Sequence, residues 1–208
     1  MSVYEPSDEY LISCIKGGEI EKASILFDRH SKNIYTYFFR LTRSREESED
    51  LTQNVFVRLI RLRGSYKPDH QFLPWVFSIA HHAYIDHCKC KSKERHQLTI
   101  YNRVASAESE NENVEDTLDL FHKAFEKLSP EYRELLVLNR YHGLTYKQIG
   151  ESLKLNEKAV KQKAFRALEK LRAEYKKLES LNMQSHALLA LLNDAYGRGE
   201  SSRAQSAD

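Results

Sequence analysis

The chain has 208 residues, a net charge of +2, 41% hydrophobic residues and 30% charged residues. This length fits one domain or two small ones, and the hydrophobic content is sufficient for compact cores. No run of about eighteen apolar residues occurs, so we expect no membrane insertion. The acidic first ten residues contain no apolar signal segment, which predicts a cytoplasmic protein. Only seven glycines and four prolines occur, and alternating strand-like runs are scarce, so we predict an all-α fold.

The first half of the chain predicts three helices before its first long loop. They cover residues 8–16, residues 19–41 and a stretch that follows a cap at Ser44. The other face of the third helix combines polar residues with Phe56 and Val57, which is unusually apolar for a surface. An exposed Phe56 would suit a docking site, and burial of Phe56 in the bundle is equally consistent with the pattern. The apolar side of this helix is expected to hold Leu51, Val55, Leu59 and Leu62.

Residues 64–71 contain glycine, proline and aspartate, which predicts a loop. A fourth helix is expected from Phe72 to about Lys93, and its far end is rich in lysine, arginine and histidine. Such a helix end, next to Tyr66 and a polar loop, could hold single-stranded nucleic acid through charge and stacking. The alternative is a solvated basic helix end. The expected core stripe of this helix is Phe72, Trp75, Val76, Ile79 and Ala83.

An acidic stretch divides the chain into two halves. Residues 106–116 hold five acidic residues and no basic one, which predicts a flexible linker. We therefore expect an N-terminal helical domain at residues 1–95, the linker at residues 96–116 and a second helical domain at residues 117–177. Residues 178–208 are expected to form a leucine-rich helix up to Tyr196 and a disordered tail from Gly197.

The sequence offers little for catalysis or metal binding. The glycines are scattered, and neither a Ser-His-Asp nor a zinc-protease spacing occurs, so we predict no enzymatic activity and no cofactor. Cys14, Cys88 and Cys90 lack a CxxC spacing. His87 and Cys90 share a helical face, which leaves a metal or redox site open, although reduced and partly buried thiols fit the pattern better.

Residues 144–172 predict two short helices joined by a tight turn. Thr145 is a suitable N-cap, and Gln148 three residues later completes a capping box. Residues 154–156 supply the turn, and Asn156 can cap the second helix. This arrangement is typical of a helix-turn-helix.

The second helix of this pair has one apolar and one polar face. Residues 145–177 carry ten Lys or Arg and four Glu, a net charge of +6. A helix-turn-helix places its second helix in the major groove of DNA, and nearby cations neutralise phosphates. The alternative is a solvated amphipathic helix in an ordinary bundle. The expected buried stripe is Val160, Ala164, Ala167, Leu168 and Leu171, and the outward-facing residues are Lys158, Lys161, Gln162, Phe165 and Arg166.

Together these segments resemble bacterial extracytoplasmic-function sigma factors over about residues 8–173. The resemblance rests on SREESEDLTQNVFVRLIR at residues 44–61 and FLPWVFSIAHHAYIDHCK at residues 72–89. It continues with LSPEYRELLVLNRYHGLTYKQIGESLKLNEKAVKQKAFRALEKLR at residues 128–172. The order and spacing of these motifs, with the acidic linker between them, are more specific than any one of them alone.

The resemblance implies two helical domains that bind core RNA polymerase and recognise two promoter elements. In such proteins the third helix docks on a coiled coil of the largest polymerase subunit, and here the matching residues are Asp50, Gln53, Asn54, Phe56 and Leu59. The residues matched to the melted minus-ten strand are Tyr66, Lys67, Asp69, His70, Gln71, His82, Asp86 and Lys89. Those matched to the minus-thirty-five duplex are Lys158, Lys161, Gln162, Phe165 and Arg166.

The chain departs from the family pattern at a few positions. The family usually has arginine and asparagine where this chain has His81 and His82, and glycine where Lys154 stands. A lysine in the left-handed conformation costs about 1 kcal/mol.

The resemblance also implies regulation. An anti-sigma partner is expected, and the leucine stripe at residues 178–192 keeps open control by the chain's own C-terminal segment. The alternative function is a stand-alone helix-turn-helix transcription regulator, in which the N-terminal bundle serves as a sensor or dimeriser.

Overall fold

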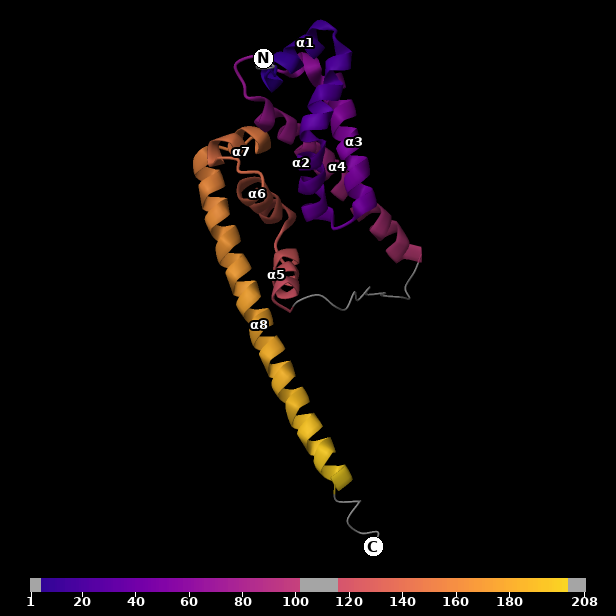
Figure 1. The fold of residues 1–208 in the computed structure, drawn as a ribbon, viewed down its shortest axis with the longest axis vertical. Helices are drawn as coiled ribbons and strands as arrows, with labels where there is room; N and C mark the ends of the chain where they lie inside the picture. Colours follow the sequence, from indigo (N-terminus) through magenta and orange to yellow (C-terminus); the bar gives the residue numbers. More distant parts are fainter. Residues whose placement is uncertain (1–4, 102–115, 202–208) are drawn as a thin grey trace. The chain divides into compact units, whose positions relative to one another are not determined.

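A computed structural model describes the backbone of residues 5–101 and 116–201 and the side chains of residues 5–93 and 120–183. Every regular element in these backbone ranges is a helix, which confirms the all-α prediction (Figure 1). No helix in the described part of the chain is long and apolar enough to span a membrane. The elements are α1 (Asp8–Gly17), η1 (Ile20–Lys22), α2 (Ala23–Thr42), α3 (Arg45–Leu62), η2 (Arg63–Ser65), α4 (Phe72–Tyr101), α5 (Asp116–Glu126), α6 (Pro130–Arg140), α7 (Tyr146–Leu153) and α8 (Glu157–Ser201).

The contacts divide the chain into two compact units. The first comprises residues 1–110 and 130–165, so it holds α1–α4, α6, α7 and the beginning of α8. The second comprises residues 111–129 and 166–208. Most of the expected linker, residues 102–115, lies outside the described backbone. The domain boundaries expected from the sequence therefore stay predictions.

Helices α2, α3 and α4 lie side by side and form the main core of the first unit (Figure 1). Their apolar residues recur every three or four positions, so each helix buries one face. Each large apolar side chain that is buried in this way contributes about 1.5–3 kcal/mol relative to an exposed one. The most buried are Leu26, Ile34, Tyr37 and Phe38 of α2, Val55 and Leu59 of α3, and Phe72, Val76 and Phe77 of α4.

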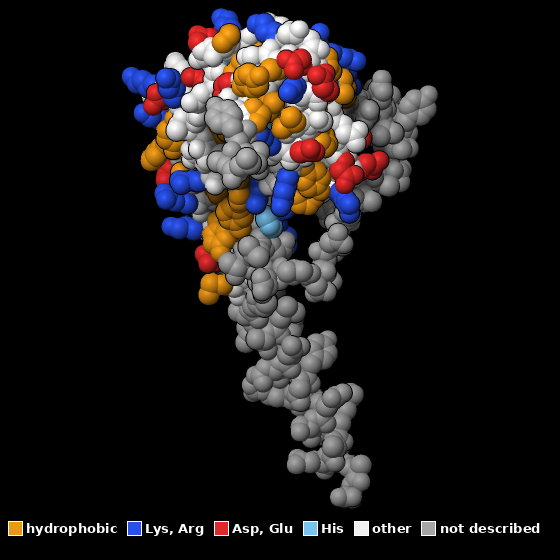
Figure 2. All heavy atoms as spheres, turned by 45° about the horizontal axis from the view of Figure 1, so that its top comes forward, with side chains coloured by type: hydrophobic (Ala, Val, Ile, Leu, Met, Phe, Trp, Pro, Cys, Tyr) orange, Lys and Arg blue, Asp and Glu red, His pale blue; other side chains and the backbone are white. Residues whose placement is uncertain are grey.

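The surface of the chain mixes both signs of charge with separate apolar side chains. Figure 2 shows one face, on which hydrophobic side chains lie among lysines, arginines and acidic residues. Among the large apolar side chains that the structure describes, Phe27 and Val57 are exposed to 41% and 47%. Both lie on the α2–α3 side of the bundle, which becomes relevant for partner binding.

Two helices extend further than the sequence predicts. Helix α4 continues to Tyr101, because residues 94–101 contain neither glycine nor proline and several good helix formers. Helix α8 is a single helix from Glu157 to Ser201, so it passes through Gly197, where we expected disorder to begin. Residues 202–208, and the side chains of the leucines beyond residue 183, lie outside the description.

The second unit contains α5 and the part of α8 that follows Phe165. In α5 the rings of Phe121 and Phe125 stack with their centroids 6.2 Å apart. Phe125 is buried, as is Ala167 on the apolar stripe of α8.

Candidate nucleic-acid interface

The helix-turn-helix begins with a complete capping box. The Thr145 hydroxyl accepts from the Gln148 backbone N–H at 3.3 Å, and the Gln148 side-chain oxygen accepts from the Thr145 backbone N–H at 2.9 Å. Two backbone donors at the start of α7 are thereby satisfied. Leu144 and Ile149 beside this cap are both buried. The expected start of the helix-turn-helix is confirmed.

The turn between α7 and α8 imposes strict requirements on its backbone. Lys154 is left-handed, with φ 56° and ψ 41°. The Leu155 N–H donates to the Gly150 carbonyl at 2.8 Å, and a Cβ on Gly150 would lie only 2.5 Å from the Leu155 carbonyl oxygen. Only glycine therefore fits this close approach. The Asn156 side chain then caps α8 by accepting from Ala159 N–H at 2.7 Å.

The first three turns of α8 separate a buried from an exposed face. Val160, Ala164 and Ala167 are at most 3% exposed, whereas Phe165 is 66% exposed. Lys161 lies 2.7 Å from Glu157 in an exposed i,i+4 pair, which is weak and can open for a phosphate. The outward orientation expected from the sequence is confirmed for Lys158, Lys161, Gln162, Phe165 and Arg166.

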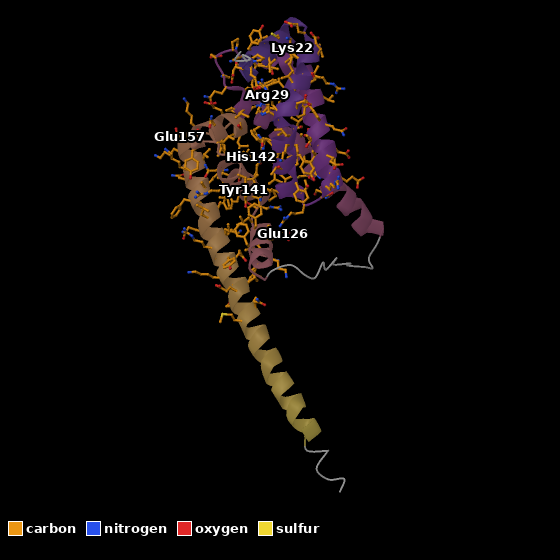
Figure 3. All side chains as sticks on the ribbon, in the orientation of Figure 1. Lys22, Arg29, Glu126, Tyr141, His142 and Glu157 are labelled. Carbon is orange, nitrogen blue, oxygen red and sulfur yellow. The ribbon has the colours of Figure 1, made fainter. Side chains whose placement is uncertain are left out.

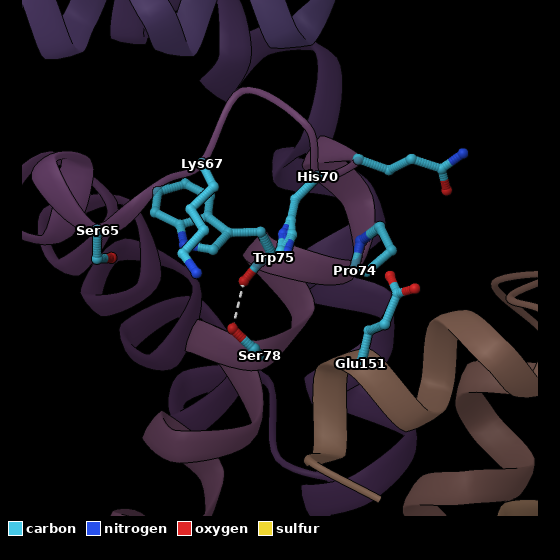
Figure 4. A pocket seen from close by; sticks show the side chains of 8 residues that line it. Ser65, Lys67, His70, Pro74, Trp75, Ser78 and Glu151 are labelled. Carbon is cyan, nitrogen blue, oxygen red and sulfur yellow. Dashed lines mark hydrogen bonds between the residues drawn. The ribbon is translucent and has the colours of Figure 1, made fainter. Parts of the chain in front are cut away.

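A cavity of about 310 Å³ lies between the loop before α4, the beginning of α4 and α7 (Figure 4). The Trp75 indole forms part of its wall, and Ser78 donates a hydrogen bond to the Trp75 carbonyl at 2.6 Å. Figure 4 shows the Glu151 carboxylate pointing from α7 toward Pro74. The wall thus combines an aromatic surface with cationic, polar and acidic groups. Its lining residues are Ser65, Lys67, His70, Gln71, Pro74, Trp75, Ser78 and Glu151.

Two aromatic residues at this cavity differ from the sequence-based expectation. Tyr66, expected to help hold a single strand, is only 1% exposed. Its hydroxyl donates to the His70 carbonyl at 2.5 Å and its ring packs edge-on against Trp75, so Tyr66 shapes the loop from inside. Burial raises the pKa of Tyr66. Trp75, expected in the core, is half-buried and faces the cavity. The residue type itself indicated such a half-buried position, because an indole has a large apolar body and one N–H group that needs a polar partner.

The remaining residues matched to the minus-ten strand are exposed. Lys67, Asp69, His70 and Gln71 lie in the loop, and Gln71 accepts from the Gln148 side chain at 2.7 Å. The other three, at spacings of four and three on α4, share one face of the helix: His82, Asp86 and Lys89.

Asp86 and His82 on that α4 face make contacts within the chain, whereas the neighbouring His81 does not lie on it. Asp86 accepts from the Arg58 guanidinium at 2.9 Å, so its charge is partly compensated. His81 points elsewhere, with its Nδ1 atom 2.8 Å from a Glu134 carboxylate oxygen. His82 is exposed, and its Nδ1 lies 2.6 Å from the Ser78 carbonyl oxygen.

Helix α3 presents only part of the docking face expected from the sequence. Asp50, Gln53 and Asn54 are exposed. Phe56 is 7% exposed and packs edge-on against Phe27 at 4.8 Å, and Leu59 is fully buried. An exposed Phe56 is not found, because Phe27 of α2 covers its ring; of the two possibilities that the pattern left open, the structure shows burial. Val57, which is not in the docking set expected from the sequence, is 47% exposed, and Leu62, expected on the apolar side of this helix, is 45% exposed.

Both halves of the chain match models of known protein families. Residues 26–94 match the family model for sigma-70 region 2, and residues 118–171 match that for sigma-70 region 4. The RNA polymerase sigma factor CarQ of Myxococcus xanthus is 30% identical over 158 residues, which cover 74% of this chain and 89% of CarQ. The ECF RNA polymerase sigma factor SigE of Mycolicibacterium smegmatis is 27% identical, and the match covers 87% of this chain and 74% of SigE.

Solved structures show the same fold. CnrH, solved with the cytosolic domain of CnrY, has a TM-score of 0.60 at 22% identity, covering 80% of this chain and 95% of CnrH. The sigma factor RpoE of Bartonella quintana, solved with the anti-sigma factor NepR, has a TM-score of 0.59 at 18% identity, covering 74% of this chain and 96% of RpoE. With both sigma-70 regions present in order, the chain belongs to the extracytoplasmic-function sigma factors, which bind core RNA polymerase and recognise promoters.

Proposed function

We propose that the exposed face of α8 contacts the minus-thirty-five duplex. The observation that carries this assignment is the continuous exposure of Lys158, Lys161, Gln162, Phe165 and Arg166 on the helix that follows a capped helix-turn-helix. Cations near the start of such a helix position it on phosphates, and its other side chains contact base edges in the major groove.

The cavity beside α4 is the proposed site for an unstacked base of the minus-ten strand. Its volume of about 310 Å³ lies within the range of small-ligand sites. The Trp75 indole offers a stacking surface, and Lys67 and His70 offer hydrogen bonds and charge. The exposed α4 face formed by His82, Asp86 and Lys89 would carry the strand onward.

Core RNA polymerase would dock on α3 through its exposed polar residues. Asp50, Gln53 and Asn54 supply hydrogen-bonding groups, and Val57 supplies the apolar contact that the sequence assigned to Phe56. Phe56 and Leu59 support this face from the core. Interfaces of this kind combine a small apolar centre with a polar rim.

Sigma factors are not enzymes, and we propose that this chain has no catalytic activity of its own and acts in the cytoplasm, where polymerase and DNA are found. We further propose that an anti-sigma protein regulates it. The support is that one structural neighbour, RpoE, was solved with the anti-sigma factor NepR. The part of α8 beyond Lys177 is a second candidate regulator.

The test combines polymerase capture with transcription. We expect the full chain to co-purify with bacterial core RNA polymerase. Arg166→Ala should leave that co-purification unchanged and lower transcription from a selected promoter about tenfold, which is the effect of one lost DNA contact. Glu169→Ala serves as the matched control, because Glu169 is an exposed residue of α8 whose ion pair is with Arg172 on the same helix. Unchanged transcription by Arg166→Ala would contradict the assignment of α8.

A further inference from the structure

Helix α1 contacts the loop between η2 and α4 at both ends of that loop. Lys16 Nζ donates to the carbonyl of Tyr66, the first loop residue, at 2.9 Å. Glu9 Oε1 accepts from the N–H of Phe72, the first residue of α4, at 3.1 Å. These partners are 50 and 63 residues apart in the sequence. Neither Glu9 nor Lys16 lines the cavity, yet both hold the loop that forms its wall.

The spacing of the two residues on α1 suits this double contact. Glu9 and Lys16 are separated by two helical turns, so they share one face of α1 and are about 10 Å apart along its axis. Ile12 and Ile15, which lie between them in the sequence, are fully buried and pack α1 onto the bundle. Helix α1 therefore presents one acidic and one basic group to the loop at a fixed separation.

Glu9 acts as a cap of α4 that is supplied by another helix. The first N–H groups of a helix have no partner within the helix, and they carry partial positive charge. Gln71, which precedes α4, is not one of the residue types favoured as N-caps. The Glu9 carboxylate accepts one of these N–H groups, and such charge-assisted hydrogen bonds are about twice as strong as neutral ones. The direction in which α4 leaves the loop therefore depends on Glu9.

Contacts of the neighbouring Asp8 fix the position of Glu9. Asp8 Oδ1 accepts from the guanidinium of Arg29 on α2 at 2.9 Å (Figure 3). Asp8 Oδ2 lies 2.7 Å from His30 Nε2. The His30 side chain is almost fully buried, and its ring centroid lies 5.1 Å from that of Phe72. The beginnings of α1 and α4 therefore meet at the same point of α2, and Glu9 is held beside the N–H that it accepts.

Lys16 restrains the cavity wall through Tyr66. The Tyr66 carbonyl is held by Lys16, its ring packs edge-on against Trp75 with the centroids 5.1 Å apart, and its hydroxyl donates to the His70 carbonyl at 2.5 Å. Trp75 and His70 both line the cavity. A displacement of Tyr66 would therefore move two groups that are proposed to contact the unstacked base.

We propose that Glu9 and Lys16 of α1 are positioning residues, which hold the loop and the beginning of α4 in the geometry that accepts the unstacked base. This inference rests on the proposed function of the cavity. A loop that is ordered before binding loses less conformational entropy when the strand binds, so its affinity is higher. The affinity for the strand therefore depends on α1, although neither residue lines the cavity.

The first test uses the sign of the effect at Glu9. Glu9→Ala removes a negative charge, so electrostatics alone would strengthen binding to DNA phosphates. Loss of positioning should instead weaken binding of a fluorescent single-stranded DNA of random sequence about tenfold. The binding is measured on the complex of the full chain with core polymerase, with core polymerase alone as background.

Two further variants complete this test. Glu9→Gln keeps an oxygen that can accept from the Phe72 N–H, and it should restore most of the affinity. Glu19→Ala is the charge-matched control, because Glu19 is exposed and its ion pair is with Lys22. Its affinity should stay within about twofold of wild type. Unchanged or tighter binding by Glu9→Ala overturns the proposal.

The second test separates positioning by Lys16 from a direct phosphate contact. Lys16→Met removes the donor to Tyr66 but also a positive charge, and either loss would weaken binding. A lost phosphate contact reduces the slope of log affinity against log salt by about one, whereas lost positioning leaves it unchanged. We expect the wild-type slope for Lys16→Met and a reduced slope for Lys89→Met, which changes an exposed residue of α4. A reduced slope for Lys16→Met contradicts its positioning role.

The third test needs no DNA. Trp75 is the one tryptophan of the chain, so tryptophan fluorescence reports on the cavity wall. In the free full chain, Glu9→Ala should make hydrogen–deuterium exchange in residues 66–72 about tenfold faster and shift the Trp75 emission to longer wavelength. Glu19→Ala should change neither. Wild-type exchange in Glu9→Ala overturns the proposal. If the wild-type polymerase complex bound no strand above background, the proposed function of the cavity would fail, and exchange would still decide whether α1 positions the loop.

Discussion

Two candidate binding regions of the chain, the exposed face of α8 and the bundle surface of α3 and α4, are built on different plans. On α8 the contact residues project from one face, while Val160, Ala164 and Ala167 hold the other face in the core. Around α3 and α4 the candidate contact residues are interleaved with buried ones, and some of them are buried themselves. Contact and stability are therefore separable on α8 and linked in the bundle. Substitutions can test this difference.

The largest effect is expected for Phe56→Ala in α3. Phe56 is 7% exposed and packs on Phe27, so its truncation leaves a cavity and should lower the free energy of unfolding by about 3 kcal/mol. Denaturant unfolding measures the loss.

Val57→Ala is the matched variant for Phe56→Ala. Val57 is 47% exposed, so we expect a stability change below about 0.5 kcal/mol together with weaker capture of core polymerase. If Phe56→Ala left the free energy of unfolding unchanged, contact residues and core residues would be separable in the bundle as they are on α8.

Gly150→Ala should break the helix-turn-helix from within. A Cβ at Gly150 would lie 2.5 Å from the Leu155 carbonyl oxygen, and backbone cannot move aside as a side chain can. We expect a loss of about 2 kcal/mol in the free energy of unfolding, as for other overpacked sites. Gly64→Ala is the control, since nothing lies within 4 Å of its added Cβ. A Gly150→Ala protein as stable as wild type would contradict the close approach.

The helix-turn-helix could be predicted from the sequence because its determinants are local. The capping box of Thr145 and Gln148, the cap at Asn156 and the outward face of α8 all follow from spacings of three and four residues. The left-handed turn was expected at Lys154 from the family pattern and is found there.

The parts that could not be predicted depend on distant residues. The pattern of α3 left the burial of Phe56 open, because its ring is covered by Phe27 of another helix. Tyr66, expected to hold a single strand, is buried, and Trp75, expected in the core, lines the cavity. The reason is that the Tyr66 hydroxyl donates to the His70 carbonyl and so holds the loop over the Tyr66 ring. The docking of Glu134 against Tyr37, 97 residues away, left no signal in the helical periodicity.

Acidic pH should weaken the packing of His142 on α2 and α4. Burial, assisted by the positive charge of Arg40, lowers the pKa of His142 from 6.5 to about 4. The unfolded chain takes up this proton below about pH 6.5 and the folded chain only near pH 4, so the folded state loses stability as the pH falls from 6.5 toward 4. Between pH 6.5 and 5.5 the stability should drop by about 1 kcal/mol more in wild type than in His142→Phe. Identical pH profiles for the two proteins would show that His142 is not buried in this way.

Lys154→Gly should stabilise the helix-turn-helix. Lys154 has φ 56° and is exposed, so glycine relieves the left-handed strain and should raise the free energy of unfolding by about 1 kcal/mol. Lys158→Gly, in the regular first turn of α8, should lower it by about the same amount. Thermal unfolding of both variants checks the opposite signs. The same sign in both would indicate that the turn carries no strain.

The smallest effect on stability, and the sharpest test of the contrast, is expected for Phe165→Ala. Phe165 is 66% exposed, so the free energy of unfolding should change by less than about 0.5 kcal/mol. An exposed ring between Gln162 and Arg166 on a recognition helix is suited to contact a thymine methyl group in the major groove. Transcription from a library with a randomised minus-thirty-five element should then show a weaker preference at one base pair, whereas Lys158→Ala should lower transcription evenly across the library. A loss of stability in Phe165→Ala, or an unchanged base preference, would mean that contact and core are not separated on α8.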